Sequence, residues 1–257
     1  MNLPHVLDRT VLIRARRRTV FSFFTDSARF ASWWGAGSSI DARPGGAVRI
    51  CYPGNTIASG TVLEVERDSR IVFTYGYEGK GQPIAPGTTR VTIALRDDPD
   101  GTLVALQHEF ADAAVRDHHV QGWRYHLSVF AHVASQQEHE GARTAIDAWF
   151  AAWNETDAHK RAALLADCCT DDVTFRDAWS ALRGQKELVP HIGGAQQFMP
   201  GLRLLQHGAV RHCQGTLLAY WRMHKGDALV ASGTNVFELS PAGRIARAVG
   251  IAAAPGA

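Results

Sequence analysis

The sequence is short of cysteines and has no long hydrophobic run, and each shortage excludes a class of protein. Its 257 residues include four cysteines, none of them spaced as Cys-x-x-Cys: Cys51, Cys168, Cys169 and Cys213. A chain of this length can bury a sufficient core without cross-links, so we expect reduced thiols, the last three as small buried side chains. No stretch approaches the roughly 20 apolar residues that cross a bilayer, so we expect no membrane partner.

Excess charge is also lacking, since the formal net charge is only +2. Nucleic-acid binding proteins usually concentrate positive charge on one face, so we expect no nucleic-acid partner. The N-terminus has neither the basic start nor the apolar run of a signal peptide, which favours a cytoplasmic protein. No phosphate loop, nucleophile elbow, zinc-ligand spacing or Rossmann glycine pattern occurs, so we expect no cofactor and no metal.

The strongest pattern that is present lies in residues 117–134. Apolar residues recur there at spacings of three and four: Val120, Trp123, Leu127, Phe130 and Ala134. This spacing places them on one face of an amphipathic helix. We expect this helix to close one domain and to lead into a second one.

The part before this helix consists of short alternating segments separated by Gly, Pro and Asp-rich turns. A strand at 10–15 is followed by a helix capped by Thr19 and by a second helix, capped by Ser27, that ends at Gly35. Further strands are expected at 39–43, 47–52, 58–66, 71–77, 88–96 and 103–110. Consecutive short strands predict an antiparallel sheet, curved around the long helix with a cavity between them.

The part after the helix has helices first and strands afterwards. Residues 135–141 are polar and predict a linker, so we place the domains at 1–138 and 139–257. Helices are expected at 142–154, 157–167 and 184–193, and strands at 173–177, 202–210, 217–224, 228–239 and 244–251. Both halves are therefore predicted as α+β, a helix-grip domain followed by a cone-shaped domain with a curved antiparallel sheet.

Several motifs of the first half occur in one order. They are Val20-Phe21, Thr25-Asp26, Phe30, Trp33-Trp34-Gly35, Arg43-Pro44-Gly45-Gly46, Gly60-x-Val62-Leu63-Glu64-Val65 and His119-x-x-Gly122-Trp123. Over about residues 5–135 this half resembles the SRPBCC helix-grip superfamily, and within it the homologues of the activator of the heat-shock-protein-90 ATPase. The resemblance implies a START-like fold with a hydrophobic cavity, and little about activity.

Four residues are candidates for this cavity. Trp33, with Trp34, either packs under the sheet or gates the cavity mouth, and packing is favoured. His119 and His126 share a helix face with Trp123 between them, and we expect Trp123 to pack while at least one histidine reaches the cavity. A metal site would need a third ligand and a different spacing, so none is expected. His108 and Glu109 could also reach the cavity.

A second set of motifs follows the linker. They are Trp149-Phe150, Trp153-Asn154-Glu155-x-Asp157, Asp172-Val173-x-Phe175-x-Asp177, Leu182-x-Gly184, Tyr220-Trp221-Arg222, Gly233-x-Asn235-Val236-Phe237-Glu238-Leu239 and Gly243-Arg244-Ile245. Over about 142–252 they resemble SnoaL-like members of the nuclear-transport-factor-2-like superfamily. The resemblance implies a cone with a deep apolar pocket. Such domains include polyketide cyclases, steroid isomerases, epoxide hydrolases and dehydratases; others only bind ligands or form homodimers.

Asp177 is the candidate catalytic residue, because it matches the family position for a pocket acid. A carboxylate in a dry pocket can exchange protons near neutral pH. Asn235 stands where many members carry an acid, which leaves a mechanism with a single base. In that mechanism Asp177 removes a proton beside a carbonyl, and Asn235, Arg222 or Trp179 stabilises the oxyanion. In the alternative, Asp177 and Arg222 form a structural ion pair.

The remaining residues predicted around this pocket are Trp153, Phe175, His191 and Phe198, with Met199 beside the last of them. Together the two halves predict a binder of hydrophobic small molecules, with isomerase- or cyclase-type acid–base catalysis in the C-terminal pocket. Two alternatives stay open, a non-catalytic carrier of lipophilic ligands and a co-chaperone-like interaction protein. The sequence decides neither whether the protein is an enzyme nor which ligand it takes, and a homodimer is an expectation from the resemblance alone.

Overall fold

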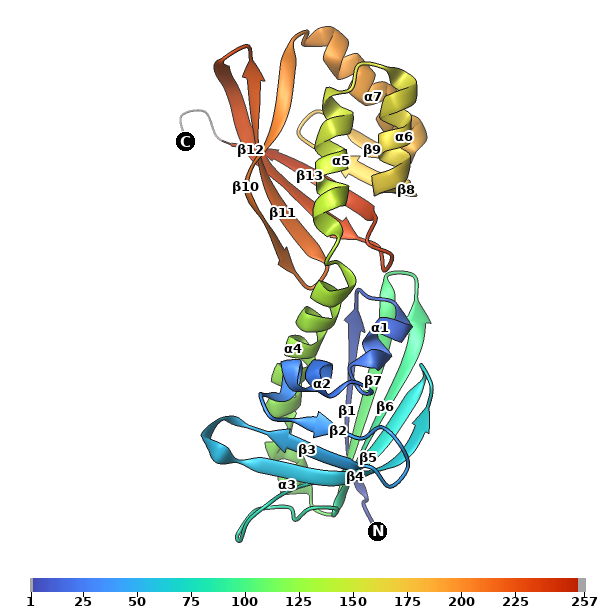
Figure 1. Ribbon diagram of the computed structural model, residues 1–257, viewed down its shortest axis with the longest axis vertical. Helices are drawn as coiled ribbons and strands as arrows, with labels where there is room; N and C mark the ends of the chain where they lie inside the picture. The colour runs from blue at the N-terminus through green and yellow to red at the C-terminus, as the bar shows by residue number, and fades with distance from the viewer. Residues whose placement is uncertain (1, 254–257) are drawn as a thin grey trace. The chain divides into compact units, whose positions relative to one another are not determined.

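The computed structural model describes residues 2–253 (Figure 1). The chain divides into two compact units, Met1–Gln137 and Glu138–Ala257. Each unit has its own sheet, its own helices and its own hydrophobic core. Both units are α+β, so the predicted fold class is confirmed.

The first unit contains a seven-stranded antiparallel sheet in the order β1-β7-β6-β5-β4-β3-β2. Its strands are β1 (His5–Ile13), β2 (Ser39–Ile40), β3 (Ala47–Cys51), β4 (Ile57–Glu66), β5 (Arg70–Tyr77), β6 (Thr89–Asp98) and β7 (Gly101–Phe110). Strands β2 to β7 neighbour one another in chain order, as a meander requires. Strand β1 adds to the free edge of β7, so the first and last strands lie together.

The helices of this unit are α1 (Arg17–Ser22), α2 (Ser27–Trp34), α3 (Ala113–His118) and α4 (Val120–Glu138), with a short 3-10 turn, η1 (Pro53–Asn55). The predicted caps were wrong. Thr19 lies inside α1, and the carboxylate of Asp26, not Ser27, accepts a hydrogen bond from the Arg29 amide at the start of α2. The Ser27 hydroxyl instead contacts the backbone of Ile40.

The predicted long helix is interrupted at His119. Asp112 caps α3 by accepting a hydrogen bond from the Val115 amide, so a separate first helix begins upstream of the predicted start. Helix α4 then runs to Glu138, through part of the segment predicted as a linker. The predicted apolar stripe is confirmed. Trp123, Leu127, Phe130 and Ala134 are buried, and Val120 packs against the core while partly buried.

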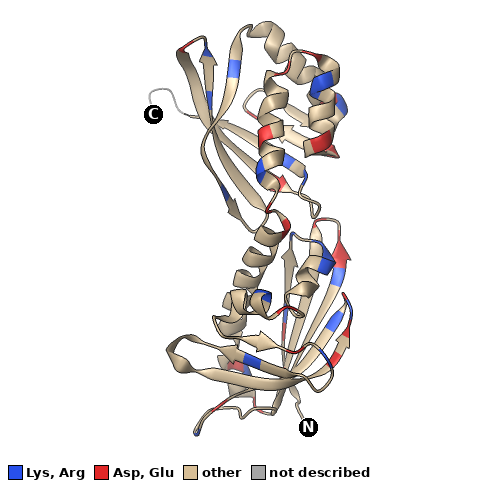
Figure 2. Ribbon diagram, viewed as in Figure 1, with Lys and Arg blue, Asp and Glu red and all other residues tan. Residues whose placement is uncertain are grey.

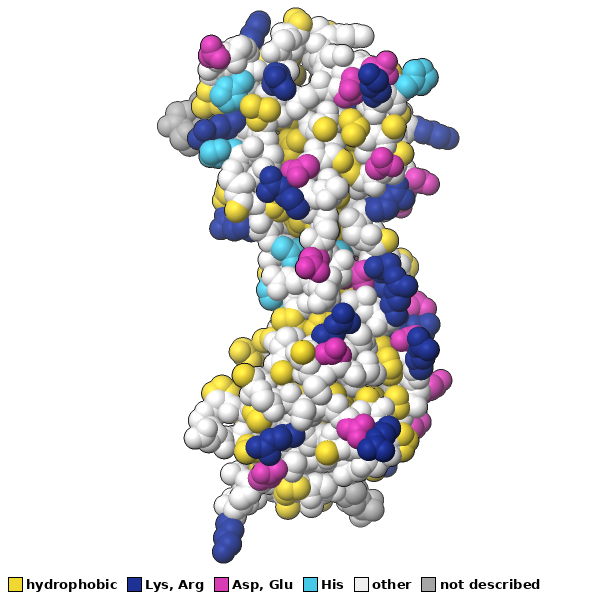
Figure 3. Space-filling model, in the orientation of Figure 1, with side chains coloured by type: hydrophobic (Ala, Val, Ile, Leu, Met, Phe, Trp, Pro, Cys, Tyr) yellow, Lys and Arg dark blue, Asp and Glu magenta, His cyan; other side chains and the backbone are white. Residues whose placement is uncertain are grey.

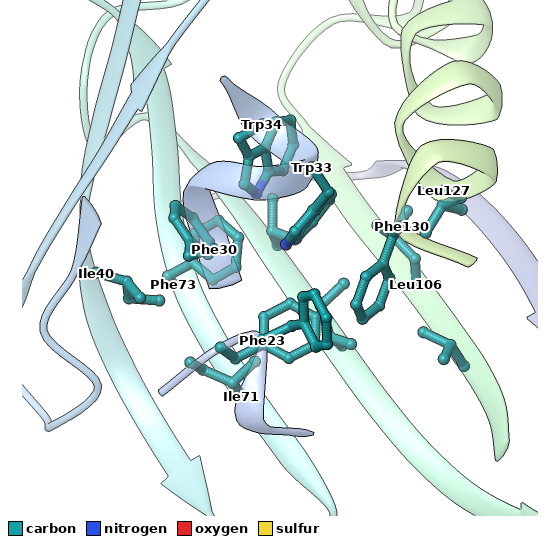
Figure 4. Close-up of a cluster of buried hydrophobic side chains, with 14 of the residues drawn as sticks. Phe23, Phe30, Trp33, Trp34, Ile40, Ile71, Phe73, Leu106, Leu127 and Phe130 are labelled. Atoms are coloured by element: carbon teal, nitrogen blue, oxygen red, sulfur yellow. The ribbon is translucent and has the colours of Figure 1, made fainter. Parts of the chain in front are cut away.

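Aromatic side chains fill the space between α2, α4 and the sheet (Figure 4). The Trp33 ring stacks on Phe130 with centroids 4.7 Å apart, and Phe23 and Phe30 meet these two rings edge-on. Such contacts add to the free energy gained from burial by about 0.5–1.5 kcal/mol each. Helix α4 is thereby fixed against the sheet along the predicted stripe.

The second unit has a six-stranded sheet in the order β10-β11-β12-β13-β8-β9. Its strands are β8 (Cys169–Arg176), β9 (Ala181–Arg183), β10 (Leu202–Cys213), β11 (Thr216–Lys225), β12 (Ala228–Leu239) and β13 (Ile245–Ala252). All pairs are antiparallel except β13 with β8, which is parallel. The short strand β9 was not predicted, because three residues carry too little alternation to be recognised.

Three helices accompany this sheet: α5 (Ala142–Asn154), α6 (Ala158–Cys168) and α7 (Gln185–Phe198) (Figure 1). Asp157 caps α6 through hydrogen bonds from the amides of His159 and Lys160. Helix α7 continues five residues beyond its predicted end and includes Pro190. Proline removes one backbone donor within the helix, and the surrounding packing of Leu188 and Ile192 maintains the helix there.

The four cysteines are free thiols. Cys168 and Cys169 are buried as expected, but Cys213 is exposed, because it lies at the end of an edge strand next to a turn. Within residues 2–253, no helix is long and apolar enough to cross a membrane. Acidic and basic side chains are interspersed over each unit (Figure 2).

Candidate functional site

The second unit contains an apolar pocket with about 720 Å³ of space, its open mouth included. It is lined by Trp153, Phe175, Asp177, Trp179, Ala195, Gln196, Met199, Leu202, Leu204, Trp221, Met223, Asn235, Gly250 and Ala252. Only three of these side chains are polar: Asp177, Gln196 and Asn235. The pocket therefore combines a largely hydrophobic wall with a few polar groups, the usual composition of a small-molecule site.

Strand alternation explains which residues face this pocket. Side chains at every second position point to the same side of a sheet. On β11, Trp221 and Met223 line the pocket, whereas Arg222 between them is exposed on the other face. Asn235 of β12 is paired with Gly250 of β13, and both line the pocket.

Asp177 immediately follows β8 and its carboxylate is held by a tight turn. Its Oδ1 accepts hydrogen bonds from the Trp179 amide at 2.9 Å, the Ser180 amide at 2.7 Å and the Ser180 hydroxyl at 2.8 Å. The side chain is half-buried. Within residues 2–253 no hydrogen bond to Oδ2 is found, so this oxygen remains available to a molecule in the pocket.

Asn235 is 5% exposed, and its side-chain amide has no hydrogen bond to any other described residue. This amide lines the pocket, so it can bind a polar group of a molecule that enters. Gly250 lies between the two polar groups. A Cβ atom at Gly250 would be 3.3 Å from Asn235 Oδ1 and 3.5 Å from Asp177 Cβ. The missing side chain of Gly250 thus keeps open the space that Asp177 and Asn235 share.

The structure brings several predicted residues together around this space. Trp153, Phe175 and Trp179 line the pocket with Asp177 and Asn235. Trp179 is 82% exposed, so it forms part of the rim and not of the floor. These residues come from β8 and the turn that follows it, from the last turn of α5 and from β12.

Three other predicted residues do not line this pocket. Arg222 faces the opposite side of the sheet from this pocket, and among the described residues no ion pair joins it to Asp177. Phe198 is 89% exposed, and its neighbour Met199 lines the pocket instead. His191 packs behind the wall, with its ring centroid 6.2 Å from those of Trp153 and Phe175.

Sequence reasoning missed Gln196, Trp221, Met223 and Gly250. The alternation of strand 217–224 contains the signal for Trp221 and Met223, because these two positions share a face. Gln196 carries no such signal. Its amide donates to the carbonyls of Trp153 at 2.9 Å and Glu155 at 3.0 Å, and thus fixes α7 to the end of α5.

The first unit contains a separate cavity with about 320 Å³ of space, its mouth included. It is lined by Trp34, Tyr52, Tyr75, Tyr77, His119, Gly122, Trp123 and His126. Among the candidates, His119, Trp123 and His126 face this cavity. Trp33 does not line it, because its ring is stacked in the core and only its carbonyl reaches His126.

A buried histidine supports the wall of this cavity. Trp123 Nε1 donates to His108 Nδ1 at 3.0 Å, so the proton of the neutral imidazole lies on Nε2, which donates to Thr89 Oγ1 at 2.8 Å. Burial lowers the pKa of His108 well below its usual value, and His119 adds to this effect. Glu109 points to the other face of the sheet, where it pairs with Arg90 at 2.6 Å.

Hydrophobic side chains also reach the surface between charged ones on each unit (Figure 3). Across residues 2–253, no three His, Cys, Asp or Glu side chains are grouped closely enough to hold a metal ion.

Comparison with known proteins gives two adjacent matches. Residues 14–135 match the family model described as activator of Hsp90 ATPase homolog 1-like protein, and residues 146–248 match the SnoaL-like domain. A search of curated proteins finds no match.

Three similar solved structures each cover about half of the chain. A candidate isomerase of the SnoaL-like family from Agrobacterium tumefaciens is 28% identical over 46% of this chain and 99% of its own, with a TM-score of 0.42. An AHSA1-like protein from Rhizobium etli is 28% identical over 51% and 82%, with a TM-score of 0.42. An Aha1 dimer from Colwellia psychrerythraea is 16% identical over 48% and 90%, with a TM-score of 0.41.

Proposed function

Because the chain carries a domain like the activator of the Hsp90 ATPase followed by a SnoaL-like domain, we propose that it binds hydrophobic small molecules and catalyses proton transfer in the second domain. In this proposal the domains meet at residues 138 and 139. The reaction is of the isomerase or cyclase type, with Asp177 as the base and the Asn235 amide as the group that stabilises the oxyanion.

One observation carries the proposal. Asp177 and Asn235 both lie next to the space beside Gly250, in a pocket whose other lining residues are almost entirely apolar. Polar groups placed at one spot in an apolar pocket fix the orientation of a ligand. Asn235 lines the pocket and its side chain has no hydrogen-bond partner among the described residues, so its amide is free to bind a polar group of a ligand.

The geometry suits removal of a proton beside a carbonyl group. The turn at residues 177–180 holds Asp177 through Oδ1 and leaves Oδ2 to accept the proton. The Asn235 atom nearest to Gly250 is Oδ1, so in this proposal the amide turns over and its N–H donates to the carbonyl oxygen as negative charge develops there. Trp153, Phe175 and Trp221 exclude water around the reacting atoms, which strengthens both interactions. The proton then returns to another carbon of the substrate.

The test uses a simple probe of proton abstraction, 1-tetralone in D₂O. We expect the wild-type protein to accelerate deuterium incorporation at the carbon beside the carbonyl, followed by proton NMR. Asp177→Asn should lower this rate by about 100-fold or more, because a positioned base contributes roughly 10²–10⁴-fold. The affinity for 1-tetralone, measured by titration calorimetry, should change less than about threefold in this variant.

Asp171→Asn is a matched control, because Asp171 is exposed on β8 and does not line the pocket. It should leave the exchange rate unchanged. Saturable binding of 1-tetralone without any acceleration would contradict catalysis and leave the non-catalytic carrier. If neither binding nor exchange occurs, the pocket does not serve apolar carbonyl compounds.

We further propose that the chain forms a homodimer through the outer face of the second sheet. Leu205, Tyr220 and Ile251 are 43%, 38% and 54% exposed there. Tyr220 and Ile251 flank Thr234 on neighbouring strands, so the three side chains form one row, and the Arg211 guanidinium lies over the Tyr220 ring. A second copy that covers this row would remove apolar surface from water.

A further inference from the structure

The walls of the first-unit cavity are almost entirely aromatic. Trp34, Trp123 and three tyrosines form most of it, and the described lining residues include no Asp, Glu, Lys or Arg. A charged ligand group would lose its hydration here without gaining an opposite charge. A flat, uncharged ring matches both the shape of the walls and their lack of charge.

Hydrogen bonds fix the two cavity histidines in one tautomer. His126 Nδ1 donates to the Trp33 carbonyl at 3.3 Å, and His119 Nδ1 donates to the Val115 carbonyl at 2.7 Å. Burial lowers the pKa of both histidines, so both rings are neutral at pH 7 and carry a lone pair on Nε2.

The two lone pairs differ in availability. His119 Nε2 accepts a hydrogen bond from the Tyr77 hydroxyl at 3.3 Å. His126 Nε2 has no hydrogen-bond partner in the part of the chain that the structure describes. Since His126 is half-buried and lines the cavity, its Nε2 is an acceptor available to a molecule that enters.

The same cavity wall also carries a hydroxyl donor. The ring of Tyr52 is centred 5.5 Å from that of His126, and its hydroxyl pairs with the Tyr75 hydroxyl at 2.8 Å. Burial raises the pKa of both tyrosines, so both keep their protons. The Tyr52 hydroxyl can therefore accept the Tyr75 proton and donate its own to a ligand oxygen.

We propose that the first domain binds the ring of an uncharged phenol or aromatic alcohol, whose hydroxyl donates to His126 Nε2 and accepts from Tyr52. This inference specifies the binding role proposed above for the first domain and is independent of the acid–base role of the second. A hydroxyl is the smallest uncharged group that satisfies a donor and an acceptor at once.

Gly122 of α4 supports the binding of a ligand in this cavity. It is an exposed residue within α4 that lines the cavity, and a Cβ atom there would meet nothing within 4 Å. Glycine weakens a helix relative to alanine, so its presence in α4 has a cost in stability. Its effect is free space next to the cavity, one helical turn before His126.

The experiment titrates the full chain with p-cresol, toluene and p-toluate, and follows the indole N–H signal of Trp123 by NMR. We expect p-cresol to bind roughly tenfold more tightly than toluene, as two hydrogen bonds would produce. No binding of the p-toluate anion is expected. His126→Phe keeps an aromatic ring but removes the acceptor, so p-cresol should then bind no better than toluene.

Gly122→Leu should block both p-cresol and toluene, because the side chain fills this space without a clash. Gln121→Leu is the control on the same helix, since Gln121 is exposed and does not line the cavity, and binding should persist. Equal affinities for p-cresol and toluene, unchanged in His126→Phe, would overturn the hydroxyl-specific site and leave an unselective apolar binder. If neither probe shifts the indole N–H signal of Trp123, the proposed binding role of the first domain is wrong as well. This outcome does not depend on whether 1-tetralone binds or exchanges deuterium in the second domain.

Discussion

At the scale of single residues, the second pocket depends on one polar group that the fold itself does not satisfy. Asn235 lies in the middle of β12 between Ala219 and Gly250, where an apolar residue would pack without cost. Its amide is buried beside Asp177 and has no hydrogen bond to another described residue. An amide without a partner in the protein is free to bind and orient a ligand.

This arrangement predicts that Asn235→Leu affects function more than stability. Leucine replaces an amide that has no hydrogen-bond partner among the described residues, so the free energy of unfolding, measured by urea denaturation, should change by less than about 1 kcal/mol. Deuterium exchange into 1-tetralone should fall by about 100-fold, the usual loss for one oxyanion donor. Lower stability together with unchanged exchange would indicate that Asn235 is a structural residue.

At the scale of elements, α4 is fixed to the sheet by a contact between an aromatic side chain and a histidine that can take up a proton. Trp123 of α4 donates to His108 of β7, and His119 and His126 lie on the same side of the helix. Burial lowers the pKa of all three histidines in the folded protein. The unfolded chain, with pKa values near 6.5, therefore takes up protons first as the pH falls.

It follows that this contact stabilises the first unit above about pH 6.5. Below that pH the free energy of unfolding falls progressively. Each histidine contributes a slope of up to about 1.4 kcal/mol per pH unit. The measurement is urea unfolding between pH 7.5 and 5.5, followed by the Trp123 indole signal. Glutamine cannot titrate, so His108→Gln should reduce the slope of the free energy of unfolding against pH, even if the variant is less stable at pH 7.5. The same slope in the variant and in the wild type would show that His108 does not take up the proton.

At the scale of the whole molecule, the second sheet leaves an apolar row on its outer face. Tyr220 and Ile251 belong to this row, although their strands contribute Trp221 and Gly250 to the pocket on the inner face. The same alternation therefore supplies one face to the pocket and the other to a surface that a second copy can cover.

We expect the wild-type chain to have twice the monomer mass by light scattering coupled to size-exclusion chromatography. Ile251→Lys should yield a monomer, because a lysine ammonium in the row cannot be buried without a partner. Leu63→Lys is the control, since Leu63 is 46% exposed on the first unit and lies outside the row. A monomeric wild type, or a dimer unaffected by Ile251→Lys, would contradict this interface.

Most of the elements could be predicted because their signals are local. The stripe from Val120 to Ala134 identified α4, and β12 and α5 begin and end at their predicted residues. The errors also have local causes. Asp26 competes with Ser27 for one cap, and Asp112 starts a helix before the predicted one. Such competition is settled by a few hydrogen bonds that sequence patterns do not resolve.

The sequence by itself determined two α+β halves, the family resemblance of each and the presence of Asp177 and Asn235 in the second. Only the tertiary structure decided which side chains meet. Arg222 was predicted beside Asp177 but faces away, whereas Gly250, which carried no signal, leaves the space between Asp177 and Asn235. The physical reason is that strand register and helix ends orient each side chain. These depend on the packing of segments far apart in the chain, and not on local composition.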